Sequence, residues 1–341
     1  MSLHNWQLLF NLETMRVVIF VGWITMISLG AFAQPSSAGY LLEVVSLSDT
    51  IAQRVISDPM MYYERWDTLA QPRFWRRVMQ LPPDSAVLNI ADTRQILEVF
   101  SAADYEAMST DQKRAFKQQK IEEYGLSHDV RLYVTYGKSD YYQIRAVMPH
   151  IHESIEVFNA QGVDPWYAQA ILLIESPGQL RQSHTGAYGP FQLMPAAARE
   201  QGLVVNSRRD DRADVKKAGR AAAGYINRVC IPETERMLNR EGIAYSRDDL
   251  WFRLLVLHSY HAGPGNVSGA LRSLNPSSGG MELIQGLWQV RYRGFGNASQ
   301  NYSQVALASL LELDRLISLE CEILCITDPR EESVPVFEVA R

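Results

Sequence analysis

The sequence predicts a mainly α-helical protein built from two modules. Its 341 residues exceed the usual size of one compact core, which suggests the two modules. Most of the chain after residue 40 carries apolar residues at helical spacing, with recognisable helix caps between them. The segment Arg131–Tyr136 alternates like a short strand before the turn at Gly137–Asp140, where we place the boundary between the modules.

The composition excludes several classes of protein. The chain is 47% hydrophobic and 21% charged, close to globular averages, so a disordered, collagen-like or multi-span membrane protein is not expected. A net charge of −5 and a pI near 5.9 argue against nucleic acid as a partner.

Residues 1–33 are expected to form a signal peptide. Arg16 is followed by the uncharged run Val17–Ala33, in which Ala31 and Ala33 give the A-x-A pattern that precedes cleavage. The mature chain would then begin at Gln34. The run is also near the lower length limit for a membrane span, so an uncleaved anchor is the alternative. We therefore expect an exported protein that is bound to a membrane only if this segment is not cleaved.

Residues 34–140 are expected to form the smaller, mostly helical N-terminal module. Val87–Phe100 carries apolar residues at helical spacing, and Ser109 and Gln112 form a capping box before another helix. Aromatic and basic residues occur together at Phe74–Arg77. We interpret the aromatic residues as part of the edge of the hydrophobic core and the arginines as exposed to solvent. The alternative is a surface that binds an anionic polymer.

The second module begins with a strongly signalled helix. Asp164 is a good N-cap and Pro165 a good first helical residue, and four aliphatic residues, Ile171–Ile174, lead directly to Glu175. A carboxyl at the end of such a buried helix would be partly desolvated, which raises its pKa and suits a general acid. Judged from this helix alone, Glu175 could instead be a glutamate that forms a salt bridge or is simply exposed to solvent.

The segment Ser183–Pro195 has the composition of a sugar-binding loop. Gly186 and Gly189 allow the backbone to come close to a ligand. An aromatic ring, an amide and a thioether that can line the site follow them: Phe191, Gln192 and Met194.

Two more helical segments follow. Ser246 and Asp249 make a capping box before the apolar run Leu250–Val267, whose first helix stops at Gly263-Pro264-Gly265. The run Ser299–Ile317 is again helical and apolar, with Tyr302 near its start.

Together these motifs resemble the catalytic domain of soluble lytic transglycosylases over residues 141–320. The resemblance rests on four ordered motifs: Glu175-Ser176, Ser183-x-x-Gly186-Ala187-x-Gly189-x-x-Gln192-x-Met194-Pro195, Tyr260-x-Ala262-Gly263-Pro264-Gly265-Asn266-Val267, and Asn301-Tyr302. It implies a lysozyme-like α fold, of the α+β superfamily, for residues 141–325, and leaves residues 326–341 as a C-terminal tail.

The resemblance also implies roles for individual residues. Glu175 would be the single catalytic acid, and Tyr302 the tyrosine whose hydroxyl lies beside it. The remaining matched positions would bind substrate: Ser183, Gly189, Phe191, Gln192, Met194, Tyr260, His261 and Asn266. Four positions depart from the family pattern: His261 replaces Asn, Phe191 replaces Met, Pro190 replaces an aliphatic residue, and Pro177 follows the Glu-Ser pair.

The implied activity is that of a lytic transglycosylase, a carbon–oxygen lyase acting on polysaccharide. Such an enzyme would cleave the β-1,4 bond between N-acetylmuramic acid and N-acetylglucosamine in periplasmic or envelope peptidoglycan and leave 1,6-anhydromuramoyl ends. One alternative is a goose-type lysozyme-like hydrolase that uses water. The other is a non-catalytic peptidoglycan-binding protein. We interpret the charge-dense run at residues 208–214, which contains Asp210, Asp211 and Asp214, as a solvated loop and helix start without a catalytic role.

Neither a metal nor a cofactor is expected. His258 and His261 are three residues apart, and His184 could be a third ligand. However, no carboxylate or cysteine completes the site at ligand spacing.

The chain has three cysteines. In an exported protein we expect Cys230 to form a disulfide with Cys321 or Cys325, because two cysteines one turn apart on a single helix pair poorly.

Overall fold

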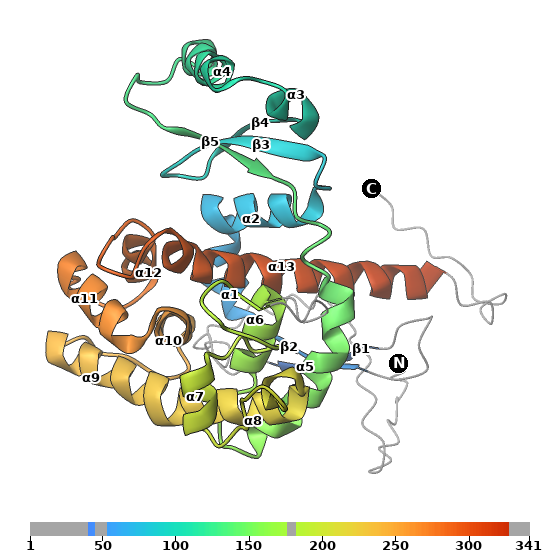
Figure 1. Ribbon diagram of the computed structural model, residues 1–341, viewed down its shortest axis with the longest axis vertical. Coiled ribbons are helices and arrows are strands. Elements are labelled where there is room, and N and C mark those ends of the chain that lie inside the picture. Colours follow the sequence, from blue (N-terminus) through green and yellow to red (C-terminus); the bar gives the residue numbers. More distant parts are fainter. Residues whose placement is uncertain (1–39, 45–52, 176–181, 327–341) are drawn as a thin grey trace, which may run out of the picture. The chain divides into compact units, whose positions relative to one another are not determined.

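The computed structural model describes residues 40–44, 53–175 and 182–326, which are mainly α-helical with two small antiparallel sheets (Figure 1). The predicted fold class is confirmed. The expected signal peptide, residues 1–33, and all of the expected tail after Ile326 lie outside this part of the chain. Within the described ranges, no helix is both long and apolar enough to cross a membrane.

The N-terminal region alternates strands with helices. Its first sheet pairs β1 (Tyr40–Val44) with β2 (Gln53–Ser57). Its second sheet has the order β4-β3-β5, with β3 at Ser85–Ile90, β4 at Ile96–Ser101 and β5 at Leu132–Tyr136. The helical elements are α1 (Met60–Tyr63), η1 (Trp66–Thr68), α2 (Ala70–Gln80), α3 (Ala102–Glu106) and α4 (Thr110–Glu123).

Two predictions for this region are confirmed and one is wrong. The strand at Arg131–Tyr136 is β5, and the capping box of Ser109 and Gln112 opens α4. Val87–Phe100 is not a helix, because it forms most of the hairpin β3–β4, in which Val87 lies opposite Val99. The turn between these strands contains Arg94 at φ 62°, a left-handed conformation that ends any helix. Each half is then too short for a helix but long enough for a strand.

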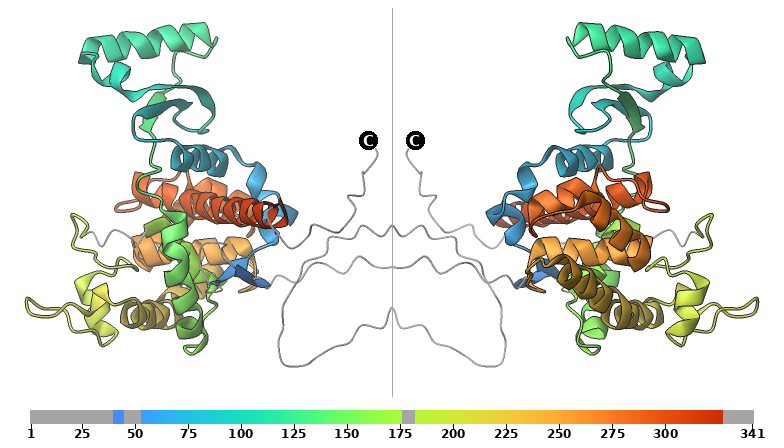
Figure 2. Two further views of the ribbon diagram at one scale, coloured as in Figure 1. Left: turned by 90° about the vertical axis from the view of Figure 1, so that its right-hand side faces the viewer. Right: turned by 90° about the vertical axis from the view of Figure 1, so that its left-hand side faces the viewer.

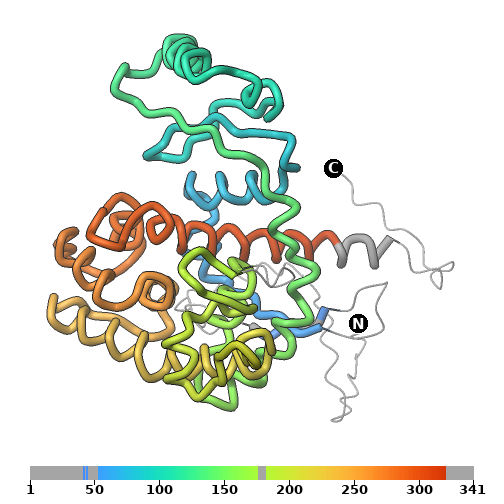
Figure 3. Tube along the Cα trace, in the orientation of Figure 1, coloured from blue at the N-terminus to red at the C-terminus, as the bar shows by residue number. Residues whose placement is uncertain are grey.

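The remaining residues form a helical bundle. Its elements are α5 (Ile144–Asn159), α6 (Trp166–Glu175), α7 (Pro195–Glu200), η2 (Asp211–Ala213), α8 (Val215–Tyr225), η3 (Ile226–Cys230), α9 (Ile231–Glu241), α10 (Leu250–Ala262), α11 (Pro264–Leu274), α12 (Met281–Leu287) and α13 (Asn297–Ile326). The long helix α13 packs against α2 as well as against α6 and α10 (Figures 1 and 2). Its trace, red in Figure 3, runs beside the blue trace of α2.

One hydrophobic core joins the two regions. Trp66 and Phe74 from the N-terminal side belong to the same buried cluster as Trp166 and Phe252 from the bundle. A second, smaller cluster around Leu88 lies under the three-stranded sheet. The predicted boundary at residues 137–140 is therefore crossed by continuous apolar packing.

Buried polar contacts fix the start of α6. The Asp164 carboxylate accepts a hydrogen bond from the backbone N–H of Trp166 at 2.9 Å, as expected of an N-cap. Arg253, on α10, is buried and lies 3.1 Å from the Asp58 carboxylate and 3.6 Å from that of Asp164. The side chain of Gln169 also exchanges two hydrogen bonds with the backbone of Ile56, at 2.8 and 2.6 Å. These contacts hold α6 against both β2 and α10.

The charge-dense run at residues 208–214 is not the solvated loop we predicted. Asp211 and Arg212 are buried, with 6% and 3% of their surfaces exposed. The Arg212 guanidinium donates hydrogen bonds to the carbonyl oxygens of Gly186 and Leu193, both at 2.8 Å, while two bonds to Asp210 orient it. A fixed fork of donors can hold two carbonyl groups at once, so Arg212 clamps the loop at residues 182–194 near both ends.

The same loop needs glycine at one position. Gly189 has φ 81°, and a Cβ atom there would overlap the carbonyl oxygen of Arg212. The loop backbone at residue 189 can therefore pack against the backbone of Arg212 only if residue 189 has no side chain.

Cys230 is buried where η3 meets α9, and burial raises the pKa of its thiol. The side chains of Cys321 and Cys325 are outside the described residues. The expected disulfide therefore stays a prediction.

Substitution of Gly189 by alanine is expected to lower the free energy of unfolding by about 3 kcal/mol or more, because it adds a backbone clash to left-handed strain. Gly202→Ala is the matched control, since Gly202 has φ 85° but open space around its Cα. It should cost only about 1 kcal/mol. Chemical denaturation of both variants measures the difference, and equal losses would contradict the proposed close approach.

Candidate active site

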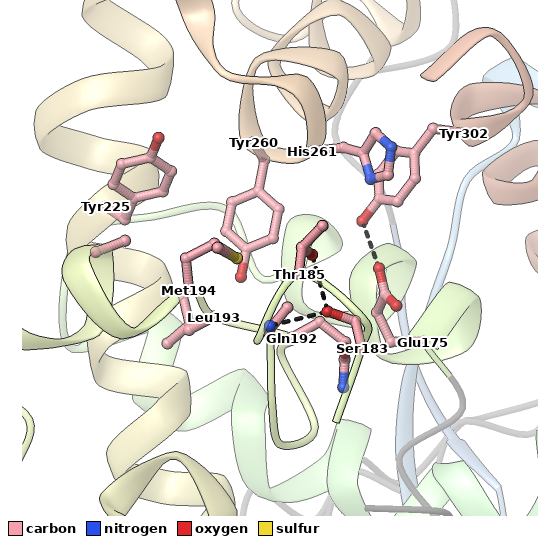
Figure 4. Close-up of a pocket in the computed structure, with 12 residues that line it drawn as sticks. Glu175, Ser183, Thr185, Gln192, Leu193, Met194, Tyr225, Tyr260, His261 and Tyr302 are labelled. Carbon is pink, nitrogen blue, oxygen red and sulfur yellow. Dashed lines mark hydrogen bonds between the residues drawn. The ribbon is translucent and has the colours of Figure 1, made fainter. Parts of the chain in front are cut away.

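Seven of the ten residues expected to form the site lie around one pocket of about 240 Å³ (Figure 4). These seven are Glu175, Ser183, Gln192, Met194, Tyr260, His261 and Tyr302. They come from the end of α6, from the clamped loop at residues 182–194, from the end of α10 and from the first turns of α13. The pocket is therefore assembled where four separate segments meet.

The carboxyl of Glu175 is in contact with the hydroxyl of Tyr302. Tyr302 Oη donates a hydrogen bond of 3.2 Å to Glu175 Oε1 (Figure 4). Desolvation raises the pKa of Glu175 to about 7, and the Tyr302 bond opposes this rise because it stabilises the charged form. A carboxyl with this pKa exists in both protonation states near neutral pH, so it can give and take a proton.

His261 supports Tyr302 from the side. Their rings stack with centroids 4.2 Å apart and planes 21° apart. Desolvation lowers the pKa of His261 to about 4, so the ring is neutral at pH 7. A neutral ring can hold the tyrosine in place without adding charge beside Glu175. The hydroxyl is thereby kept directed at the carboxyl.

His258 and His261 belong to no metal cluster among the described residues. The neighbouring His258 is fully buried, and its Nε2 lies 2.8 Å from Ser303 Oγ. Among the residues that the structure describes, no group of three or more potential ligands is placed to hold a metal ion.

Ser183 organises the rim of the pocket. Its Oγ accepts a hydrogen bond from the backbone N–H of Ala187 at 2.9 Å, and its own N–H donates to the Ala187 carbonyl at 2.8 Å. Thr185 Oγ1 lies 3.0 Å from the same hydroxyl. Ser183 thus closes a short turn that lines the pocket.

Gln192 and Tyr260 are fixed through the backbone of the same loop. Gln192 has φ 44°, and its side-chain amide donates to the carbonyl of Gly189 at 3.0 Å. Tyr260 Oη donates to the carbonyl of Phe191 at 2.7 Å. Met194 remains 42% exposed, so its thioether is open to a ligand.

Three expected substrate-binding residues do not line the pocket. Phe191 is fully buried and stacks on Phe158 at 5.8 Å, so it supports the loop from beneath. Gly189 meets the Arg212 backbone, as described above. Asn266 donates to the carbonyl of Ala262 at 2.8 Å, which ties α11 to the end of α10.

The pocket is also lined by residues that the sequence analysis did not assign to the site: Thr185, Ala187, Leu193, Ala197 and Tyr225. Thr185, Ala187 and Leu193 lie inside the Ser183–Pro195 segment, whose glycines and polar residues were the signal for it. Tyr225 comes from α8 and packs edge-on against Tyr260 at 5.8 Å. No local pattern marks Tyr225, because its place depends on how α8 and α10 pack.

Comparison with known proteins gives a family match and a similar solved structure. Residues 154–278 match the family model described as Transglycosylase SLT domain. No curated protein matches the chain. A solved structure of an inactive mutant of lytic transglycosylase Slt from Pseudomonas aeruginosa is similar at 16% identity and a TM-score of 0.34. That match covers 72% of this chain and 37% of the Slt chain, so it spans little more than a third of that protein.

The family match contains Glu175, the clamped loop and the motif that begins at Tyr260, and it ends before Tyr302. It includes most of the residues that form the pocket. The resemblance expected from the sequence motifs is confirmed over residues 154–278, which match the Transglycosylase SLT domain model.

Proposed function

We propose that this protein is a peptidoglycan lytic transglycosylase of the periplasm or cell envelope. The observation that carries the proposal is one carboxyl, Glu175, with a pKa of about 7, hydrogen-bonded to Tyr302 in a pocket of an SLT domain. Export rests on the signal-like sequence of residues 1–33.

In the first step, protonated Glu175 donates its proton to the oxygen that links N-acetylmuramic acid to N-acetylglucosamine. The C1–O bond of the muramic acid breaks as the carbonyl oxygen of its own 2-acetamido group attacks the anomeric carbon. The substrate supplies the nucleophile in this route. The protein therefore needs to supply only the acid.

In the second step, the Glu175 carboxylate accepts the proton of the C6 hydroxyl. The C6 oxygen attacks the anomeric carbon and the acetamido oxygen leaves, which closes the 1,6-anhydro ring. Glu175 is protonated again and ready for another cycle. Between the two steps the hydrogen bond from Tyr302 stabilises the carboxylate and directs it.

The acids available at the pocket favour this route over hydrolysis with two carboxylates. Of the described residues that line the pocket, Glu175 is the only Asp or Glu, and residues 176–181 include neither. Asp210 and Asp211 form ion pairs with arginines, and Asp214 caps α8. A two-carboxylate mechanism needs a second acid facing the bond. Water as the acceptor, as in a goose-type lysozyme, would give reducing ends that are heavier than anhydro ends by one water.

Glu175→Gln is expected to reduce the release of soluble fragments from purified sacculi at least about 100-fold, since glutamine cannot donate the proton. Mass spectrometry of the fragments measures both the rate and the anhydro ends. Glu200→Gln is the matched control, because Glu200 is exposed on α7 and does not line the pocket. Near-normal release by Glu175→Gln would contradict the proposal. Binding to sacculi without any product from the unmodified protein would support a non-catalytic binding role instead.

The pH profile should follow the first proton transfer. Glu175 must be protonated to act as the acid, and its protonated fraction falls as the pH rises through about 7. Activity measured as kcat/KM on sacculi is therefore expected to fall about tenfold for each pH unit well above 7. A profile that stays flat up to pH 9 would argue against Glu175 as the acid.

Tyr302→Phe tests the hydrogen bond at the carboxyl. Loss of the bond removes a contact that favours the charged form, so the pKa of Glu175 should rise further. We expect the alkaline limb of the pH profile to move to higher pH and the maximal rate to fall about tenfold or more. An unshifted limb would mean that the two groups are not coupled.

A further inference from the structure

A second, smaller pocket lies at the junction of the three-stranded sheet, α13 and the segment before α13. It has a volume of about 60 Å³, enough for a carboxylate but too small for a sugar ring. Three arginines line it, Arg94, Arg131 and Arg291, against one carboxylate, Asp92. The excess of two positive charges predicts an anionic ligand.

Arg94 is the buried cation of this pocket. It is 8% exposed, and its Nη2 donates to Asn301 Oδ1 at 3.1 Å. The guanidinium also lies over the rings of Phe74, Trp75 and Tyr133, at 5.4, 5.8 and 5.7 Å. No carboxylate among the described residues forms an ion pair with it. Asp92 acts on this guanidinium electrostatically, but its carboxylate is paired with Arg131. A buried cation that forms no ion pair of its own is costly, and an incoming anion would offset that cost.

The backbone at Arg94 is also strained. Its φ of 62° is rare for a residue other than glycine and disfavours any long side chain. Such strain persists only when surrounding contacts enforce it, and it is common at binding sites. Here it places the guanidinium at the tip of the β3–β4 turn, where this turn meets α13.

The other two arginines are open to solvent. Arg131 pairs with Asp92 at 2.7 Å and is 59% exposed at its side chain. Arg291 is exposed and has no ion-pair partner among the described residues. It is therefore available to a ligand without breaking an existing contact. Asn297, the first residue of α13, adds the positive end of a helix to the same pocket.

Two consecutive residues of α13 belong to the two pockets, one to each. Asn301 holds Arg94, and its neighbour Tyr302 holds Glu175. Consecutive helical residues point about 100° apart, so the two pockets occupy adjacent faces of one turn. An extended peptide of three or four residues spans roughly 10–14 Å, about the width of a helix. A peptide attached to a sugar in the first pocket could therefore reach the second.

We propose that the pocket formed by Arg94, Arg131 and Arg291 binds a carboxylate of the peptide stem that peptidoglycan carries on its N-acetylmuramic acid. This inference rests on the proposed function, because the stem is part of the substrate of a lytic transglycosylase. The N-terminal sheet thereby gains a role, since it supplies two of the three arginines. The enzyme would prefer glycan that still carries its peptides.

The first test compares two substrates from one preparation, peptide-bearing glycan and the same glycan after an amidase has removed the stems. Arg291→Gln is expected to lower kcat/KM about tenfold on the peptide-bearing glycan through KM, and to leave the naked glycan unchanged. Arg293→Gln is the matched control, because Arg293 is exposed, carries the same charge and does not line the pocket. An equal loss on both substrates, or no loss on either, would overturn the inference.

The second test does not depend on turnover. The Glu175→Gln variant is titrated calorimetrically with a muropeptide that has free carboxylates, with the same muropeptide after amidation, and with inorganic phosphate. We expect the free acid to bind about tenfold more tightly than the amide, and this preference to vanish when Arg291→Gln is added. Binding of phosphate alone would identify a site for small free anions and overturn the assignment to the stem. If the unmodified protein cleaves neither glycan, the proposed function fails, while this titration still decides whether the pocket binds the carboxylate.

Arg94→Gln examines the buried cation with the same two measurements. The substitution removes the contact with Asn301, so its folding is checked by its thermal denaturation midpoint. Arg94→Lys keeps the charge and serves as the conservative variant. Compared with the unmodified protein, we expect Arg94→Lys to keep part of the preference for peptide-bearing glycan and Arg94→Gln to lose it. Should Arg94→Gln not fold, the Arg291→Gln results stand on their own.

Discussion

The desolvation of one carboxyl is the constraint on which the rest of the site depends. All residues of α6 from Trp166 to Ile174 are buried, and Glu175 is the last residue of this helix, at the edge of the hydrophobic core. Burial alone would make the acid weaker, and a very weak acid donates its proton poorly. The hydroxyl of Tyr302 limits this rise, and the resulting pKa of about 7 suits both proton transfers.

Much of the protein serves to keep that carboxyl in position. Arg253 and Asp58 fix the start of α6, and Gln169 bonds its middle to β2. On the other side of the pocket, Arg212 holds the loop at residues 182–194 by two of its carbonyl groups. The start of α6 and the loop that lines the pocket are thus each anchored by a buried arginine. Rigid placement matters because proton transfer requires hydrogen-bonding distance.

Helix α13 connects the catalytic pocket with the N-terminal region. It carries Tyr302 at the carboxyl and Asn301 at the guanidinium of Arg94, while Gln304 accepts a hydrogen bond from Trp75 at 3.1 Å. The N-terminal region is therefore packed onto the helix that completes the candidate active site. This arrangement provides a physical route by which that region can affect the choice of substrate.

Elements whose signals are local could be predicted from the sequence. The N-cap at Asp164, the capping box at Ser109, the strand at residues 131–136 and the motifs around Glu175 and Ser183 all depend on neighbouring residues. The tertiary structure alone decided the contacts between distant residues. It showed that Val87–Phe100 is a hairpin, that Arg212 is a buried clamp, and that Tyr225 and Arg94 line pockets. The physical reason is that burial and pairing depend on what packs from elsewhere. Tyr302 lies 127 residues from Glu175, and Asn301 lies 207 residues from Arg94.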